Sequence, residues 1–242
     1  MSPVSPSSLA ASASAVPQRR TVDAPVRVLH WLLALCVLGA YLTSEGDAWR
    51  AVHITLGYTA AGLLVTRLLW GLVGPRPARL SSLASRLSGW KGWVRSLRAG
   101  ARPSGRLTQN LLLALTIVGL LALVALTTAS GYAHYQAWWG EALEDVHEGL
   151  GNGLIAAVVA HVALVVAISV ARRQNQLVPM LTGRSPGPGP DTIPHPRRGL
   201  AALILLAVLG FWGWQWAHPP VITSHHAAHE AGADHAADDD DD

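Results

Sequence analysis

The 242-residue sequence has little charge and almost no cysteine. Only 14% of its residues are charged, whereas soluble domains carry about a quarter. Cys36 is the single cysteine, so no disulfide can form within the chain and no pair of cysteines can bind a metal ion. Apolar residues make up 50% of the sequence. This composition argues against a soluble domain and indicates a protein that lies in lipid.

The apolar residues gather in five runs that are long enough to cross a bilayer. A hydrocarbon core of about 30 Å needs roughly 20 residues of helix, and backbone groups in lipid must form their hydrogen bonds within the segment. We predict membrane-spanning helices at about residues 26–43, 51–73, 111–130, 143–170 and 199–217. The predicted fold is an all-α integral membrane protein, a four-helix transmembrane bundle with a fifth, C-terminal transmembrane helix.

The basic residues fall almost entirely on one side of these helices. Of the 18 Lys and Arg, all but Arg50 precede the first helix, lie at or after the end of the second, or follow the fourth. The positive-inside rule then predicts a protein of the bacterial inner membrane with a cytoplasmic N-terminus and a periplasmic C-terminus. The basic segment 74–106 is predicted to lie along the inner leaflet as an amphipathic segment that contacts anionic lipid. Docking of a soluble partner is the alternative for that segment.

Three further segments differ from the spanning helices in composition. Residues 1–20 are rich in Ser, Ala and Pro without a continuous apolar core, so we expect a disordered cytoplasmic lead and not a cleaved signal peptide. Residues 185–198 form a Pro/Gly-rich linker before the fifth helix. Residues 218–242, rich in His and Asp, are expected to form a disordered tail.

Four histidines, His30, His53, His147 and His161, lie inside the predicted spans. An ionisable side chain in a membrane is costly, so four of them on three helices need a common explanation. His147 and His161 are 14 residues apart, which places them within about 40° on one helix face and about 21 Å apart along the axis. The helix directions put His53 level with His147 in the outer half and His30 level with His161 in the inner half.

Two imidazoles on facing helices at the same depth are the axial ligands that a b-type haem requires. The sequence has no C-x-x-C-H motif, so the two predicted haems are held without covalent links. Arg27 and Arg67 on the inner side are candidates to pair with haem propionates, with contact to lipid headgroups as the alternative. Six glycines are candidates to leave room for the macrocycle, with ordinary helix packing as the alternative. They are Gly39, Gly57, Gly62, Gly149, Gly151 and Gly153.

Four motifs resemble the bacterial cytochrome b561 family and the related cytochrome b subunits of nickel–iron hydrogenases. They are RVLHW at 27–31, HITLGYTAAGLLVTRLLWGLVGPRPAR at 53–79, HEGLGN at 147–152 and VPMLTGR at 178–184. The resemblance covers about residues 21–184 and keeps the 14-residue histidine spacing. It implies a di-haem four-helix core, exchange of electrons with quinone and, in some members, anchoring of a periplasmic oxidoreductase. The chain departs from the family at TQN (108–110), where members often carry a His-Asn-Pro-like sequence.

The leading functional prediction is therefore a membrane di-haem b-type cytochrome that carries electrons between the quinone pool and a redox partner. It is either an electron-transfer protein or a subunit of a quinone-linked oxidoreductase. The expected partners are membrane lipid, quinone and a periplasmic or membrane redox protein, and no nucleic acid. Two alternatives stay open at this point. One is a metal or proton transporter that uses the intramembrane histidines, and the other is a haem-bearing membrane anchor without its own quinone site.

Overall fold

The computed structural model describes residues 17–138 and 142–220. Within this part, five helices are long and apolar enough to cross a membrane, which confirms the predicted all-α integral membrane fold. They are α2 (Ala24–Leu42), α3 (Arg50–Val73), α6 (Gly105–Tyr135), α7 (Ala142–Arg172) and α9 (Arg198–Ala217).

The third helix, α6, has 31 residues and is longer at both ends than the apolar run that predicted it. Its N-terminus is fixed by Ser104, whose hydroxyl accepts a hydrogen bond from the Leu107 amide at 3.3 Å. Polar residues in the first turns do not interrupt a helix that is capped in this way. Hydropathy reports only the apolar part of such a helix, so the predicted bounds were too narrow.

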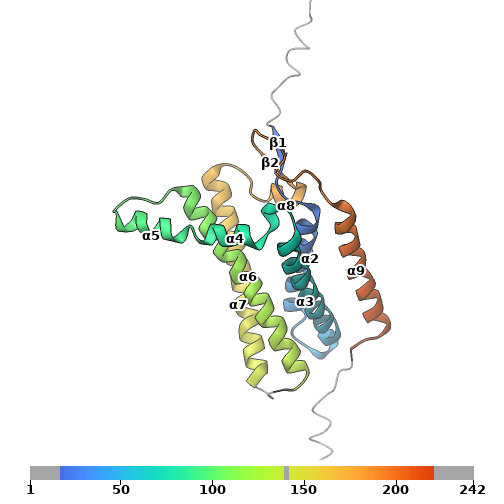
Figure 1. Ribbon diagram of the computed structural model, residues 1–242. Helices are drawn as coiled ribbons and strands as arrows, with labels where there is room; N and C mark the ends of the chain where they lie inside the picture. Colours follow the sequence, from blue (N-terminus) through green and yellow to red (C-terminus); the bar gives the residue numbers. More distant parts are fainter. Residues whose placement is uncertain (1–16, 139–141, 221–242) are drawn as a thin grey trace, which may run out of the picture.

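The short elements lie at the two ends of the long helices (Figure 1). One end holds the 3₁₀ turn η2 (Arg76–Ala78), the helices α4 (Leu80–Leu87), α5 (Trp90–Arg98) and α8 (Val178–Thr182), and two strands. We call this the basic end, because most arginines of the chain lie there. The opposite end carries the turn η1 (Asp47–Trp49) between α2 and α3.

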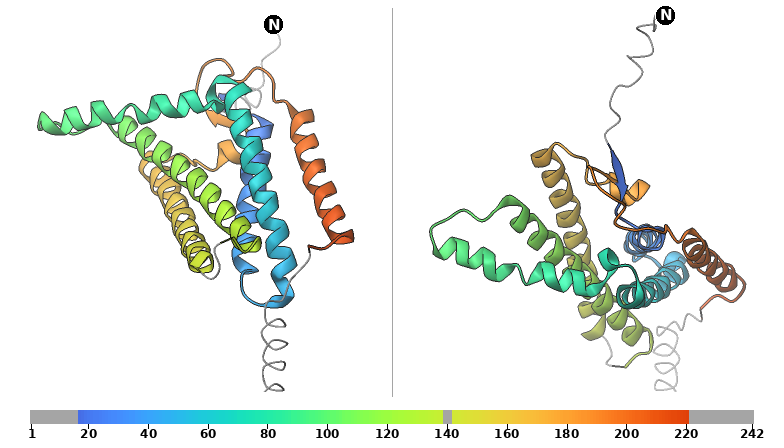
Figure 2. Two further views of the ribbon diagram at one scale, coloured as in Figure 1. Left: turned by 60° about the horizontal axis from the view of Figure 1, so that its bottom comes forward. Right: turned by 45° about the horizontal axis from the view of Figure 1, so that its top comes forward.

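The long helices form two packed groups (Figures 1 and 2). In the first group, α2 packs along α3, and α9 lies beside them on the side away from α7. Its core is a cluster of apolar residues that includes Leu29, Leu63 and Val208. In the second group, α6 packs along α7. In α7, despite its 31 residues, the only buried positions are Leu154 and Ile168, so most of its surface is not covered by the chain.

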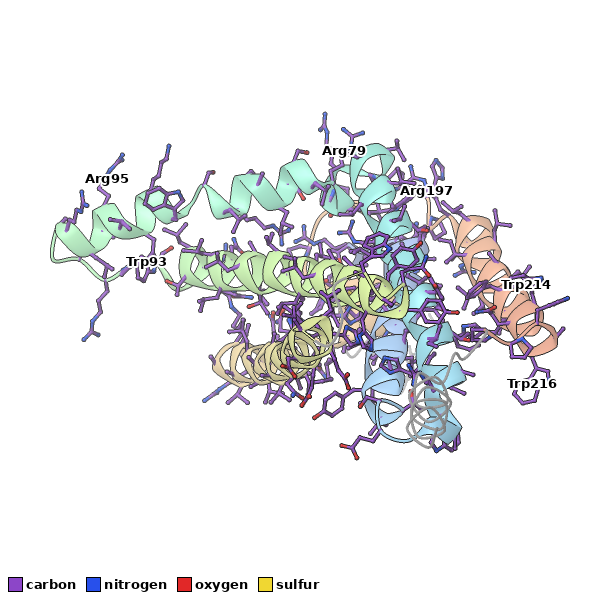
Figure 3. The ribbon with its side chains drawn as sticks, turned by 90° about the horizontal axis from the view of Figure 1, so that it is seen from below. Arg79, Trp93, Arg95, Arg197, Trp214 and Trp216 are labelled. Carbon is purple, nitrogen blue, oxygen red and sulfur yellow. The ribbon has the colours of Figure 1, made fainter. Side chains whose placement is uncertain are left out.

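The segment 76–98 leaves the bundle sideways at the basic end. α4 packs on α6, and α5 continues beyond it (Figures 1 and 2). Trp93 and Arg95 project to opposite sides of α5 (Figure 3). The segment is helical and amphipathic, as the sequence predicts. Its contact with anionic lipid stays a prediction.

The two strands correct the predicted ends of the bundle domain. β1 (Gln18–Arg20) pairs antiparallel with β2 (Arg184–Pro186). Residues 18–20 therefore do not belong to a disordered lead, and the linker predicted at 185–198 begins inside a strand. The linker also contributes a buried residue, Ile193, which is 1% exposed. Such a short ribbon is built from backbone hydrogen bonds and has no apolar pattern that the sequence could reveal.

One buried carboxylate joins three helices at the basic end. Asp23 is fully buried, and it caps α2 by accepting a hydrogen bond from the Val26 amide at 3.1 Å. Its other oxygen accepts a bond from Trp70 Nε1 of α3 at 3.0 Å and lies 3.9 Å from Arg197 Nη1. The Arg197 guanidinium, at the start of α9, also lies 5.3 Å from the centre of the Trp70 ring. The contacts of this side chain add a polar link between the start of α9 and the helices α2 and α3.

We expect Asp23→Ala to lower the thermal unfolding midpoint of the protein in detergent more than any surface change nearby. The substitution leaves the Trp70 N–H and the Val26 amide without their acceptor, which costs about 1–3 kcal/mol, whereas the partly exposed Arg197 regains contact with water. Asp191→Ala is the matched control, because it removes an exposed pair with Arg20 that is worth at most about 1 kcal/mol. Helical circular dichroism measured against temperature tests this, and equal midpoints for the two variants would contradict it.

Candidate functional site

The four intramembrane histidines meet as two pairs. The ring centres of His53 (α3) and His147 (α7) are 5.9 Å apart, and those of His30 (α2) and His161 (α7) are 6.5 Å apart. These are the two pairs that the helix directions predict. The His30–His161 pair lies toward the basic end, and the His53–His147 pair lies toward the opposite end. α7 supplies one histidine to each pair because its two histidines share a face.

The spacing of both pairs fits two imidazoles on one iron atom. Two metal–nitrogen bonds of about 2 Å and the two ring radii place the ring centres about 6.3 Å apart. Among the described residues, no three His, Cys, Asp or Glu side chains are grouped so that they could hold a bare metal ion. A haem needs only two axial side chains, because the macrocycle supplies the other four ligands. The residues present therefore fit haem.

The His53–His147 pair is fixed in the tautomer that a metal ligand needs. His53 Nδ1 lies 2.8 Å from the Ala40 carbonyl oxygen, and His147 Nδ1 lies 3.0 Å from the Thr127 carbonyl oxygen. A carbonyl oxygen only accepts hydrogen bonds, so in both rings Nδ1 carries the proton and donates it. Nε2 of each ring then keeps its lone pair. Metal-bound histidines almost always donate their other ring N–H in this way, to a carboxylate, a backbone carbonyl or water.

The His30–His161 pair has fewer hydrogen bonds to its ring nitrogens. His161 Nδ1 is buried and has no hydrogen-bond partner in the described part of the chain. Its neighbour His30 packs its ring against Trp31, with ring centres 5.3 Å apart. A buried nitrogen without a partner costs about 1–3 kcal/mol. An unsatisfied imidazole that faces a second imidazole is the arrangement expected where a metal-containing cofactor binds.

Gly131 of α6 makes room for the His147 ring, a role that sequence analysis did not predict. A Cβ atom at residue 131 would lie 2.7 Å from His147 Cε1 and 3.0 Å from its Nδ1. The neighbouring Ser130 is buried, and its hydroxyl lies 3.2 Å from the same nitrogen. Because the contact depends on how α6 and α7 are aligned, no pattern within either helix reveals it.

Two of the six candidate glycines lie on the histidine faces of their helices. Gly57 follows His53 by four residues and Gly151 follows His147 by four, so each lies within about 40° of its histidine. A Cβ atom at either glycine would meet nothing within 4 Å. These two positions leave open space where a flat macrocycle would need it.

The other candidate glycines do not serve the histidine pairs in this way. Gly39 packs against α3, where its Cβ would lie 2.9 Å from Leu56 Cδ1. Gly62 follows His53 by nine residues and faces the opposite side of α3, about 180° away. Gly149 and Gly153 lie more than about 100° around α7 from His147. Gly39 thus serves ordinary helix packing and Gly62 faces away from the histidine pair, whereas the role of Gly149 and Gly153 stays a prediction.

An apolar layer separates the two pairs. Leu154 lies halfway between His147 and His161 on the same face of α7, and it is buried. It packs in one cluster with Leu64 of α3 and Val124 of α6. The bundle therefore has two separate polar centres, about 21 Å apart along α7, with a dry layer between them.

The two candidate arginines lie at the basic end and contact backbone carbonyls. Arg27 donates from Nε to the Met180 carbonyl oxygen at 3.2 Å and from Nη2 to the Leu181 carbonyl oxygen. Arg67 Nη1 donates to the Ala78 carbonyl oxygen at 3.3 Å. Both side chains lie at the end of the bundle that holds the His30–His161 pair. Their role as partners of propionates stays a prediction.

Comparison with known families agrees with this geometry. The family model of the prokaryotic cytochrome b561 family matches residues 21–183. The chain belongs to this family. It is therefore a membrane b-type cytochrome of electron transfer, and the family implies haem b as its cofactor. In this cytochrome the helix α9 lies outside the matched residues.

Two curated relatives are similar over most of their length. The probable Ni/Fe-hydrogenase 1 B-type cytochrome subunits of Escherichia coli strain K12 and of Escherichia coli O157:H7 are each 25% identical over 206 residues. Each alignment covers 66% of this cytochrome and 88% of the relative. No solved structure matches the chain.

We expect Gly131→Ala to disturb only the centre at His53 and His147. The added methyl group displaces the His147 ring, so the optical spectrum and midpoint potential of one haem population change while the other keeps its properties. Gly119→Ala is the matched control on the same helix, because a Cβ atom there meets nothing within 4 Å. Redox titration of the purified variants checks this. A Gly131→Ala protein with wild-type potentials would show that the ring does not need this space.

Proposed function

We propose that this cytochrome carries electrons between the quinone pool and a redox partner through two non-covalent haem b groups. His53 and His147 are the axial ligands of one haem, and His30 and His161 are those of the other. The observation that carries the proposal is the pair of imidazole–imidazole separations, 5.9 and 6.5 Å, each close to the spacing of a bis-imidazole iron.

The chain's contribution to this function is to hold and separate the two groups. Haem iron carries one electron at a time, at a potential set by its axial ligands and their surroundings. The carbonyl groups of Ala40 and Thr127 keep Nε2 of His53 and His147 free to bind, which supports their role as ligands. The apolar layer around Leu154 keeps water out of the space between the two centres.

Arg27 and Arg67 are proposed to neutralise the propionates of the haem at the basic end. Arg67 follows His53 by 14 residues and therefore lies on the same face of α3, four turns nearer the basic end. Its contact with the Ala78 carbonyl is a single hydrogen bond of a group with five donors, so other donors are available to a carboxylate.

The charge distribution supports an orientation with the basic end in the cytoplasm of a bacterium and the opposite end in the periplasm. α4 and α5 then lie on the inner leaflet, where their arginines meet anionic headgroups. The relatives are named as cytochrome subunits of a hydrogenase, so the proposed partner is a redox enzyme that docks on the membrane domain.

We expect purified protein to contain two haems per chain that acid acetone extracts completely. Replacing one histidine of a pair should then affect the same haem as replacing its partner. His53→Ala and His147→Ala should share one change in optical spectrum and potential, because each removes one axial ligand of the same iron. His30→Ala and His161→Ala should share a different change.

Redox titration of the remaining haem in each variant decides between the pairings. If His53→Ala matches His161→Ala, the proposed ligand pairs are wrong. A fully loaded wild-type protein with one haem per chain would overturn the di-haem proposal as a whole. Haem content measured on the same samples separates loss of a ligand from loss of the fold.

The proposed orientation predicts the behaviour of reporter fusions. A reporter that is active only in the periplasm should be silent after residue 88, between α4 and α5, and active after residue 219. Residue 88 is on the basic end, and residue 219 is beyond the far end of α9. The reverse pattern would mean that the bundle is inserted the other way up.

A further inference from the structure

A cavity lies between α3 and α9, on the side of the bundle away from α7. Its volume is about 690 Å³, within the range of pockets that hold small ligands. In Figures 1 and 2, α9 runs alongside α3 and α2 and has no other long helix on its outer side. Most of the lining is apolar; the lining residues used below are Tyr58, Thr59, Gly62, Ala207, Phe211 and Gln215.

Gln215 is the unusual residue of this lining. It lies in a membrane-spanning helix, its side chain faces the cavity, and it is only 8% exposed. Its amide is not among the fully buried polar groups that lack a partner, so the amide atoms are reached from the cavity that Gln215 lines. The amide offers two donors and one acceptor, and pairing them is favourable at this depth in a membrane. The cavity therefore has a polar group that is available to a ligand.

The neighbouring polar groups hold the cavity in shape. Trp212 Nε1 of α9 donates to the Thr59 hydroxyl of α3 at 2.9 Å, and that hydroxyl donates to the Thr55 carbonyl oxygen at 2.7 Å. These bonds fix the position of α9 along α3 at the level of Gln215. Tyr58 lies at the same level and packs against Tyr132, with the two ring centres 6.3 Å apart. These contacts hold the end of the cavity that contains Tyr58, Thr59 and Gln215, which we call its polar end.

This polar end lies close to the His53–His147 pair. Tyr58 follows His53 by five residues, about 7.5 Å along the axis of α3. Gly62, in the wall of the cavity, faces the side of α3 opposite to His53. Only the thickness of α3, about 10 Å, separates the cavity from the histidine pair. One helix therefore presents a proposed redox centre on one face and an apolar cavity on the other.

We propose that this cavity binds the head group of a membrane quinone, with the Gln215 amide donating a hydrogen bond to a quinone carbonyl. The apolar walls formed by Ala207, Phe211 and Gly62 hold the ring and the start of the isoprenoid tail. A lipid acyl chain in the same place would leave the amide unpaired. The inference rests on the proposed quinone-linked electron transfer and assigns it a place on α9, outside the residues that the family shares.

The proposed electron transfer accounts for the electrons and protons of a quinol bound at this site. Oxidation of a bound quinol would release two electrons, one at a time, to a haem held by His53 and His147. It also releases two protons to water at the nearby end of the bundle. Reduction of the quinone is the reverse. Gln215 neither gains nor loses a proton in this exchange, so its role is to bind and position the head group.

Photoaffinity labelling tests the location without depending on activity. An azido derivative of decylubiquinone, applied to the haem-loaded protein, should label peptides that contain Tyr58 or Gln215. Excess decylubiquinone should prevent the labelling, and excess phosphatidylglycerol should not. Labelling confined to other helices, or labelling that phosphatidylglycerol abolishes, would overturn the proposal.

Kinetics of haem reduction by decylubiquinol provide the second test. We expect Gln215→Leu to raise the KM for decylubiquinol about tenfold, and Ala207→Trp, which fills the cavity, to do the same or more. Haem content and the dithionite-reduced spectrum should stay as in the wild type. Gln109→Leu is the matched control, because it makes the same change in the transmembrane helix α6 away from the cavity.

The outcomes separate failure of the site from failure of the function. If decylubiquinol reduces the wild type and both cavity variants equally well, the quinone binds elsewhere and this inference is wrong. If the wild-type haem is reduced by dithionite but not by decylubiquinol, the proposed quinone link fails, and the cavity proposal fails with it. An equal rise of the KM in Gln109→Leu would overturn the assignment of the quinone to this cavity.

Discussion

The helical periodicity of α7 is the constraint on which the rest of this structure depends. A spacing of 14 residues puts His147 and His161 on one face, close to four full turns apart. The positions of the other two histidines are set by their contact with this face. α2 and α3 run antiparallel, so each can bring one histidine to a different level of α7, and the separations of 5.9 and 6.5 Å result. A single residue inserted between the two histidines would turn one of them away by about 100°.

The packing around α7 is loose. In α7 only Leu154 and Ile168 are buried, which leaves room for the two haem groups that we propose. The open positions at Gly57 and Gly151 have the same effect on the histidine faces. Cohesion is therefore concentrated elsewhere, in the apolar cluster shared by α2, α3 and α9 and in the contacts of the buried Asp23.

The helix α9 contributes to this structure in two ways. It completes the apolar core of the group that carries His30 and His53, because Val208 packs in the same cluster as Leu29 and Leu63. It also forms the second wall of the cavity on the back of α3. α3 is thus used on both faces, with its histidine toward α7 and its small residue Gly62 toward α9. The fifth helix, outside the residues matched by the family, therefore contributes to the apolar core and forms one wall of the cavity.

Much of this could be predicted from the sequence, because the signals are local and one-dimensional. The length of the apolar runs determines the number of spanning helices, since the thickness of a bilayer fixes helix length. The direction of each helix and the 14-residue spacing determine which histidines share a depth.

The tertiary structure decided those features that depend on the alignment of separate helices. Examples are Gly131 against the His147 ring, the face on which Gly62 lies, and the contacts of Asp23 with Trp70 and Arg197. A periodic pattern defines the faces of one helix, but only packing defines which face meets which neighbour, and so the cavity beside Gln215 belongs to the tertiary structure alone.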